Sequence, residues 1–277
     1  MKQGGRSIEA KKSLGQHFLN NERIPAKMAD AANVLKGDVV LEIGPGTGVL
    51  TSELLARGAQ VLAIEADVRA IASLKEAFAA EIQEKRLTIL HMDVREMDLG
   101  KLGLRPHGYK VVANIPYYLS GMLFRTFLEH ENQPSCLVFL VQREVAERIA
   151  KDKKESILSL SVKVFGDPRY VETVKRGNFN PPPKVDSAII SVSNISKERL
   201  GTIPQKFFFS LVHEGFKSRR KQLFGNLGTL RKKDELTHIF STLDLPLSVR
   251  GEDVSLDNWL HLAHKFFSTD NTEKSSS

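Results

Sequence analysis

The sequence lacks three features that would place it in a specialised class of protein. Cys136 is the one cysteine among 277 residues, so no internal disulfide can form, and we expect this residue to be buried in a strand, in a reducing compartment. No apolar run reaches the roughly 20 residues needed to span a bilayer, and the N-terminus has no hydrophobic signal core. Internal repeats are also absent. We therefore expect a cytoplasmic protein that is neither disulfide-stapled, nor membrane-spanning, nor built from repeats.

The composition is that of a globular protein with a basic surface. The hydrophobic content of 41% is ample for a core, in one large domain or two. Lys and Arg total 40 against 33 Asp and Glu, which gives a net charge of +7 and a sequence pI near 9.4. This charge suits a polyanionic partner, although basic charge alone is weak evidence for one.

Strand-like and helix-like segments alternate through the first 150 residues. Such alternation predicts a parallel sheet covered on both faces by helices. The expected strands are residues 39–43, 60–64, 87–91, 109–113 and 136–141, and the expected helices are 24–35, 49–57, 68–78, 119–128 and 143–150.

The pattern changes past residue 155. A helix at 157–165 precedes two expected strands, 169–174 and 188–192, which we predict to add an antiparallel edge to the sheet. Residues 179–184 lie between them, and their prolines are incompatible with a regular element. Helices are expected at 205–216, 233–243 and 255–267. We predict a sheet domain over 1–200, a helical domain over 201–267 and a disordered tail over 268–277.

Glycines 44, 46 and 48 lie between an expected strand and an expected helix, where the backbone can turn tightly and approach a ligand. Val49 occupies the position of the last glycine of G-x-G-x-x-G, so the spacing fits neither a dinucleotide site nor a P-loop. A bare turn is the alternative. Glu65 favours a ligand, because a carboxylate at the end of the next strand can accept hydrogen bonds from both ribose hydroxyls of an adenosine. Asp93 follows the third strand and could accept from an adenine amine or cap a helix.

Asn114-Ile115-Pro116-Tyr117 follows the fourth strand and points to methylation of a base amine. An exocyclic amine is a poor nucleophile because its lone pair is delocalised into the ring. A side-chain amide oxygen and a backbone carbonyl held rigid by proline can accept both amine hydrogens and localise that pair. A neighbouring aromatic ring offers a face on which a flipped-out base can stack.

Phe179 and a basic cluster complete the candidate sites. Phe179 precedes three prolines and could close over a base or simply pack under a loop. The basic cluster comprises Lys217, Arg219, Arg220 and Lys221, interleaved with apolar residues in a way that predicts an amphipathic helix end. We expect this cluster to contact RNA phosphates in a salt-sensitive manner.

Five motifs, in this order, give nearly the whole chain a resemblance to the KsgA-type (RsmA) ribosomal RNA adenine dimethyltransferases. They are residues 13–19, 41–48, 114–117, 179–187 and 215–221. The resemblance implies a doubly wound methyltransferase sheet (class I, Rossmann-like) with a small C-terminal helical domain. It also implies S-adenosylmethionine as the methyl donor, contacted by His17, Leu19, Gly44, Glu65, Asp93 and Asn114, with Gly46 in the same glycine turn. His17 stands where many relatives carry Asn, so we expect its contact to be through the backbone.

The resemblance further implies the substrate, two adjacent adenosines near the 3′ end of small-subunit (16S) rRNA, each dimethylated on N6. In our hypothesis Asn114 and the Pro116 carbonyl accept the N6 hydrogens, while Tyr117 and Phe179 stack on opposite faces of the adenine. Neither a strong general base nor a metal is needed. Two alternatives remain: an Erm-type methyltransferase of large-subunit RNA, and a non-catalytic assembly or transcription factor on the same scaffold. We expect a monomer.

Overall fold

The computed structural model describes residues 15–218 and 220–274. Within these residues the chain divides into two compact units. The sheet unit comprises residues up to Ala146 together with Asp167–Ile195, and the helical unit comprises Glu147–Gly166 together with the residues from Ser196 onward. The chain passes from the sheet unit into the helical unit for the second time after Ile195, near the boundary that we predict at residue 200. Residues 147–166, which we expected to belong to the sheet domain, are grouped with the helical unit.

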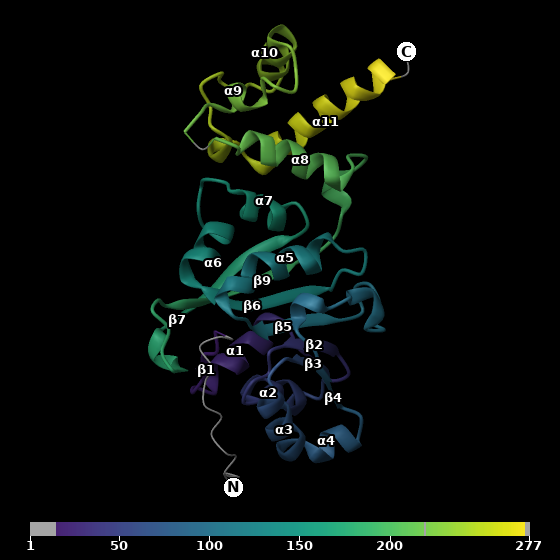
Figure 1. Cartoon of the computed structure of the whole chain (residues 1–277), viewed down its shortest axis with the longest axis vertical. Helices are drawn as coiled ribbons and strands as arrows, with labels where there is room; N and C mark the ends of the chain where they lie inside the picture. Colours follow the sequence, from purple (N-terminus) through teal and green to yellow (C-terminus); the bar gives the residue numbers. More distant parts are fainter. Residues whose placement is uncertain (1–14, 219, 275–277) are drawn as a thin grey trace. The chain divides into compact units, whose positions relative to one another are not determined.

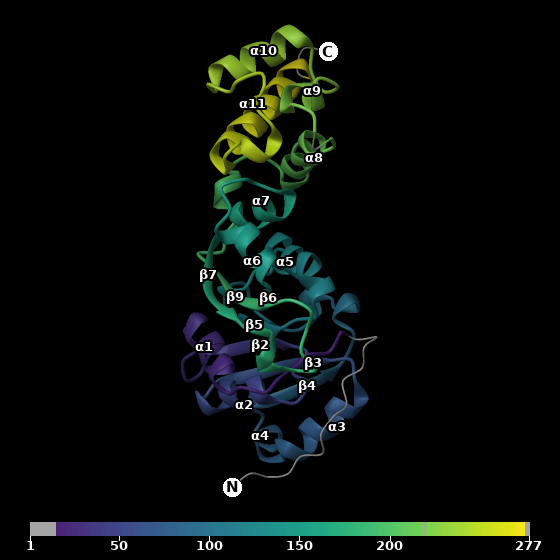
Figure 2. The ribbon, with the colours of Figure 1, turned by 90° about the vertical axis from the view of Figure 1, so that its left-hand side faces the viewer.

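The sheet unit is built on a seven-stranded sheet (Figures 1 and 2). Its strands, in the spatial order β4-β3-β2-β5-β6-β9-β7, are β4 (Leu87–His91), β3 (Gln60–Glu65), β2 (Val39–Ile43), β5 (Lys110–Asn114), β6 (Cys136–Gln142), β9 (Ser187–Ser193) and β7 (Asp167–Val174). The first five are parallel, and β9 runs antiparallel to both β6 and β7. The predicted fold class is confirmed, including the antiparallel edge.

Helices cover the sheet on both faces because its strands alternate apolar side chains up and down. Val138 and Leu140 belong to one buried cluster together with residues of α1 (Arg23–Ala31) and α2 (Val49–Ala56). Phe139, between them, points the other way and contacts the rings of Phe124 and Phe127 on α5 (Ser120–Glu129). The unit also contains α3 (Val68–Ala77), α4 (Ala79–Gln83) and the start of α6 (Arg143–Ala150).

The strand order places a crevice at the carboxyl ends of β2 and β5. The chain leaves β2 toward β3 on one side, and β5 lies on the other side, so the connections diverge at this point. In open α/β sheets such a reversal of strand order leaves room for a ligand beyond the strand ends. The glycine turn follows β2, and Asn114 ends β5, so the topology brings these two motifs together.

A two-stranded ribbon joins two motifs that are far apart in sequence. In it β1 (Phe18–Leu19) pairs with β8 (Phe179–Asn180), with Leu19 opposite Phe179. Our expectation that residues 179–184 are wholly irregular was therefore wrong for the first two. The prolines begin only after β8, so its two residues keep the extended backbone and the donors that pairing requires.

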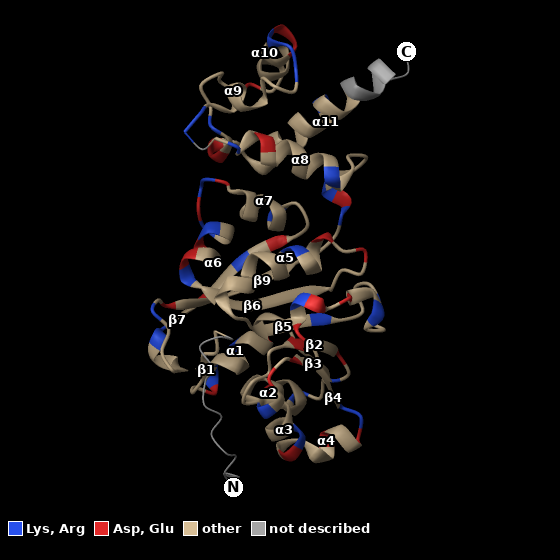
Figure 3. Ribbon diagram, viewed as in Figure 1, with Lys and Arg blue, Asp and Glu red and all other residues tan. Residues whose placement is uncertain are grey.

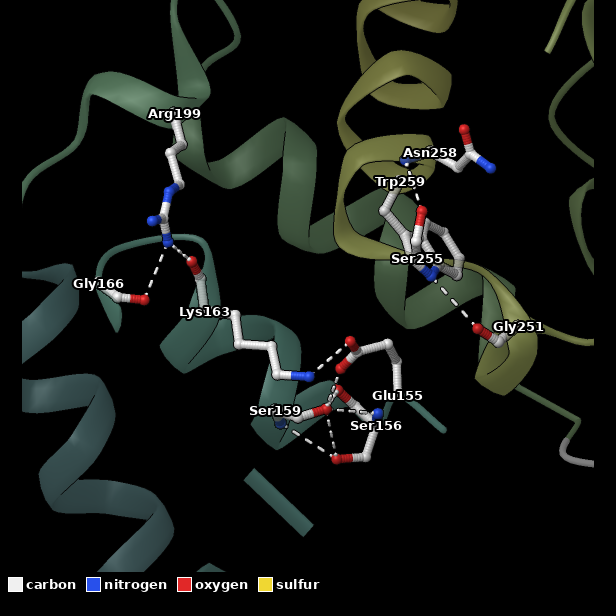
Figure 4. A network of polar contacts seen from close by, with 10 residues as sticks. All are labelled: Glu155, Ser156, Ser159, Lys163, Gly166, Arg199, Gly251, Ser255, Asn258 and Trp259. Carbon is white, nitrogen blue, oxygen red and sulfur yellow. Dashed lines mark hydrogen bonds and ion pairs between the residues drawn. The ribbon is translucent and has the colours of Figure 1, made fainter. Parts of the chain in front are cut away.

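The helical unit packs around Trp259. It contains α7 (Ile157–Lys163), α8 (Gln205–Gly215), α9 (Leu223–Leu227), α10 (Lys233–Thr242) and α11 (Leu256–Lys274). Trp259 is fully buried, stacks on Phe216 and donates a hydrogen bond from Nε1 to the Gly251 carbonyl (Figure 4). A Cβ atom on Gly215 would lie 2.3 Å from the indole, so only glycine fits there.

Polar contacts fix the ends of α7 in the same unit (Figure 4). Ser156 and Ser159 form a capping box at its N-terminus, and Lys163 in its last turn pairs with Glu155 at 2.6 Å. Arg199 donates to the carbonyls of Lys163 and Gly166. Residues 155–166 are thereby tied to the later part of the chain.

Three local expectations are corrected. The first helix ends at Ala31 rather than Leu35, because Asn33 adopts a left-handed φ of 47°. α11 continues to Lys274, so residues 268–274 of the expected disordered tail (268–277) are helical, and residues 275–277 lie outside the described residues. Cys136 is a strand residue but only partly buried. No helix in the described part of the chain is long and apolar enough to cross a membrane.

Candidate active site

Two adjoining hollows lie at the carboxyl ends of the parallel strands in the sheet unit. The larger is lined by residues from three of the five motifs and by the strand-end residues Glu65 and Asp93. Its lining is Gly15, Gln16, His17, Phe18, Ile43, Gly44, Gly46, Ile64, Glu65, Ala66, Met92, Asp93, Val94, Asn114, Ile115, Pro116, Tyr117, Tyr118 and Leu119. The smaller, about 30 Å³, lies under the glycine turn and shares Phe18, Gly44, Gly46 and Asn114 with the larger. Most of the predicted site residues therefore meet at one place.

The glycine turn is held against the end of β3. Gly46 has a φ of +56° and donates its N–H to Glu65 Oε2 at 3.1 Å. A Cβ atom on Gly46 would lie 2.9 Å from the ring of Phe18, so a side chain would displace the N-terminal segment. The turn can approach a ligand closely because its backbone carries no side chain there.

Glu65 is held rigidly by the backbone. It is 6% exposed, and its Oε1 accepts hydrogen bonds from the N–H groups of Ala66 and Asp67, both at 2.9 Å. A carboxylate offers about four acceptor positions, so three backbone donors leave capacity for a ligand hydroxyl. Its orientation is fixed before any ligand arrives.

Asp93 lies in the larger hollow and also serves the capping role that we considered as the alternative. It caps a short 3-10 helix (Val94–Glu96) by accepting from the Arg95 N–H, and it pairs with the Arg95 guanidinium at 2.5 Å. These hydrogen bonds hold the pKa of Asp93 below its usual value. The side chain is therefore an ionised acceptor at neutral pH.

The amide of Asn114 is oriented by the N-terminal segment. Its Nδ2 donates to the carbonyl of His17 at 3.1 Å. With the nitrogen committed to this bond, the amide oxygen is the group that Asn114 offers to a ligand in the hollow. An acceptor beside a reacting amine is what the sequence hypothesis requires at this position.

Pro116 and Tyr117 form the wall next to Asn114. The Pro116 carbonyl already accepts from the Leu119 N–H at 2.9 Å, which leaves one of its two lone pairs. The Tyr117 ring stacks on His17, with centroids 5.9 Å apart, and its hydroxyl lies 2.6 Å from Ser187 Oγ. Burial raises the pKa of the Tyr117 phenol, which stays neutral.

The ribbon residues Leu19 and Phe179 lie behind the site. Leu19 is 8% exposed and lines the smaller hollow. Phe179 is 3% exposed and belongs to the buried hydrophobic cluster that also contains residues of α1 and α2. It is not among the described residues that line either hollow. The structure thus does not bring Phe179 to the face of a bound base.

Two site residues escaped the sequence analysis. Tyr118, directly after the Asn-Ile-Pro-Tyr motif, lines the larger hollow and is 61% exposed, although an aromatic of this size is usually covered. Gln16 also lines it and donates from Nε2 to Asp67 at 3.2 Å, which ties the N-terminal segment to the end of β3. A second aromatic next to a predicted stacking residue was the available signal for Tyr118.

The basic cluster lies in the helical unit, after α8 (Figure 3). Lys217 is 64% exposed and pairs with Glu214 at 2.9 Å. Arg220 and Lys221 are exposed, whereas Arg219 lies outside the described residues. Exposed cations such as Lys217, Arg220 and Lys221 are suited to bind a polyanion.

The fold and site together define a class I methyltransferase, and comparisons with known proteins narrow the class to a family. The family described as Ribosomal RNA adenine dimethylase matches residues 8–266. The chain therefore belongs to the ribosomal RNA adenine dimethylase family, and it is an enzyme that methylates adenine in ribosomal RNA.

Individual relatives agree with this assignment. The chain is 36% identical over 258 residues to a ribosomal RNA small subunit methyltransferase A of Dehalococcoides mccartyi, covering 92% of this chain and 88% of the relative. It is 36% identical to the enzyme of the same name from Fusobacterium nucleatum, covering 92% and 97%. A crystal structure of a dimethyladenosine transferase from Plasmodium falciparum superposes with a TM-score of 0.79 at 28% identity, covering 92% and 98%. The 23S rRNA methyltransferase ErmE shares the fold, with a TM-score of 0.74 at 24% identity, covering 90% and 99%.

Proposed function

We propose that this protein transfers methyl groups from S-adenosylmethionine to N6 of two adjacent adenosines near the 3′ end of small-subunit rRNA, giving N6,N6-dimethyladenosine during small-subunit biogenesis. The observation that carries the chemistry is the fixed amide of Asn114, whose nitrogen is bound to the His17 carbonyl. The choice of the small subunit rests on the family resemblance and on the names of the relatives.

The residues around the larger hollow fit the methyl donor. Glu65 is a buried carboxylate with acceptor capacity left for a ribose hydroxyl, and Asp93 is an ionised acceptor suited to an adenine amine. The glycine turn allows the amino-acid end of the donor to approach the backbone closely. When bound, the donor supplies an electrophilic methyl group on a positively charged sulfur.

Asn114 and Pro116 prepare the acceptor amine. The Asn114 oxygen and the remaining lone pair of the Pro116 carbonyl accept the two N6 hydrogens, which localises the nitrogen lone pair toward the methyl group. The methylated amine is acidic enough to lose its proton to water, so no residue of the chain acts as a strong base. Catalysis rests on orientation and on hydrogen-bond acceptors that need no rearrangement.

The aromatic residues hold the base. Tyr117 is fixed by His17 and Ser187, and the exposed ring of Tyr118 lies at the same hollow. We assign Tyr117 to one face of the adenine. A role for Phe179 on the other face requires its side chain to leave the core position that it occupies in this structure. Tyr117→Ala should raise the KM for RNA far more than the KM for the methyl donor.

The deciding experiment is methyl transfer from labelled S-adenosylmethionine to small and large ribosomal subunits that lack the modification, followed by identification of the nucleosides by mass spectrometry. We expect dimethyladenosine in the small subunit alone. Label in large-subunit RNA would favour the Erm-type alternative. Tight binding to the small subunit without label would favour a non-catalytic assembly factor.

A further inference from the structure

Glu42 is a buried carboxyl group that the mechanism above does not use. It lies in β2, two residues before Gly44, and is 1% exposed. Its Oε2 accepts a hydrogen bond from the Thr51 hydroxyl of α2 at 2.8 Å. Its Oε1 is buried, and no side chain or backbone group among the described residues hydrogen-bonds it. A buried carboxyl oxygen without a partner is costly and calls for a reason.

The unpartnered group belongs to the smaller hollow. Glu42 lines this hollow together with Gly44 and Asn114, both of which also line the larger one. The reacting methyl must lie beside Asn114, and the positive sulfur that carries it is one bond away. With the donor in the larger hollow as proposed, its charged end would lie next to the wall that contains Glu42.

The surroundings of Glu42 disfavour its charged form. The neighbouring strands place the apolar residues Ala63 and Val112 opposite it. Thr51 of α2 is uncharged, as are Phe18 and Asn114 on the hollow, and the charged group that acts on Glu42 is Glu65 of β3, which is also acidic. Burial and this like charge raise the pKa of Glu42 to about 8, against the lowering effect of Thr51. In the free protein at neutral pH the carboxyl is therefore neutral.

We propose that Glu42 recognises the positive charge of the methyl donor and releases its proton to solvent when the donor binds. The inference rests on the proposed function, because it takes S-adenosylmethionine as the ligand of the larger hollow. On binding, the neutral Glu42 carboxyl loses its proton to the buffer and becomes a carboxylate beside the bound cationic donor. A cation close to a buried carboxyl stabilises the ionised form strongly, because little water screens the pair.

The proposal predicts proton release that depends on the charge of the ligand. Titration calorimetry of the full-length protein at about pH 7, in buffers of different ionisation enthalpy, measures the number of protons released. We expect close to one proton with S-adenosylmethionine. We expect almost none with 5′-methylthioadenosine, which keeps the adenosine but carries neither the sulfonium nor the amino acid. Equilibrium dialysis with labelled donor measures binding independently of heat.

Two variants test whether the released proton comes from Glu42. Glu42→Gln keeps the shape of the side chain and should abolish the release, while the donor still binds, but more weakly, through Glu65 and Asp93. Thr51→Val removes the hydrogen bond that lowers the pKa, so the release should persist to higher pH than in the wild-type protein, where it should fade above about pH 8.

The outcomes separate this inference from the proposed function. Donor binding without proton release would overturn the role of Glu42 and leave the methyltransferase assignment intact. Equal release with 5′-methylthioadenosine, or unchanged release in Glu42→Gln, would also overturn it. Failure of the donor to bind in dialysis would overturn the proposed function and this inference together.

Discussion

At the scale of single residues, the site is a set of side chains oriented in advance by backbone groups. The His17 carbonyl fixes the Asn114 amide, and the backbone N–H groups of Gly46, Ala66 and Asp67 fix Glu65. Each of these bonds uses one part of a polar group and leaves another part for a ligand. Such preorganisation lowers the reorganisation that the reaction would otherwise require.

The first prediction concerns the Asn114 amide. Asn114→Ala should lower turnover by about 10²- to 10³-fold, the usual loss when one preorganised hydrogen-bonding group is removed from a reacting centre. The donor should still bind, more weakly by its one contact with Asn114, because Glu65 and the glycine turn are untouched. Steady-state methyl transfer and equilibrium dialysis check the two halves, with Asn258→Ala on α11 as the matched control. Near-normal turnover of the Asn114 variant would rule out the proposed mechanism.

The second prediction concerns the effect of pH on stability through Glu42. Its pKa rises from an ordinary 4.5 to about 8 on folding, so its contribution to stability is complete below about pH 4.5 and is lost as the pH rises through 8. Glu42→Gln stays neutral at every pH, so it should become more stable than the wild-type protein as the pH rises, by about 3–5 kcal/mol at pH 9. Denaturant unfolding of both proteins across this range measures the difference. A constant difference would show that Glu42 does not titrate between these values.

The residues that the sequence could predict are those whose chemistry is local. The Gly44 turn, Glu65 and Asn114 each stand at a strand end, and parallel strands bring such ends together. Phe179 is different, because its environment depends on Leu19, which is distant in sequence. The pairing places the ring in the core, and no local pattern carries that information.

At the scale of elements, the β1–β8 ribbon connects the N-terminal segment to the loop after Phe179. Beyond the ladder itself, the Asn20 N–H donates to the Asn178 carbonyl at 3.0 Å, and His17 Nδ1 lies 2.7 Å from the Pro181 carbonyl. The segment that fixes Asn114 is therefore itself held by this loop. Alternating strands and helices were predictable from periodicity, whereas a ribbon of two-residue strands is too short to leave a periodic pattern.

The third prediction tests whether Phe179 is a core residue of this ribbon. Phe179→Ala should destabilise the protein by about 3–5 kcal/mol, the usual cost of truncating a buried phenylalanine, and Phe179→Leu should cost clearly less. Tyr118→Ala, at an exposed ring, serves as the matched control and should change stability little. Denaturant unfolding gives the three values. A loss below about 1 kcal/mol for Phe179→Ala would indicate that the ring spends its time outside the core and would restore the stacking role.

At the scale of the whole molecule, the net charge of +7 and the basic cluster suit a long polyanion rather than a mononucleotide. Net charge alone attracts RNA without positioning it. Phosphate contacts by particular side chains release counterions and appear as the slope of binding against salt. The slope therefore distinguishes residues that contact RNA from residues that only add charge.

The fourth prediction uses that slope. Arg220→Ala combined with Lys221→Ala should reduce the slope of log K against log salt by about 1.4–1.8 for binding to the small subunit, because each phosphate contact contributes about 0.7–0.9. Lys36→Ala combined with Lys75→Ala removes the same charge from exposed positions of the sheet unit and should leave the slope nearly unchanged. Filter binding at several salt concentrations measures both. Equal slopes for the two double variants would mean that the cluster acts through net charge only, and the phosphate contacts would then have to be sought elsewhere on the protein.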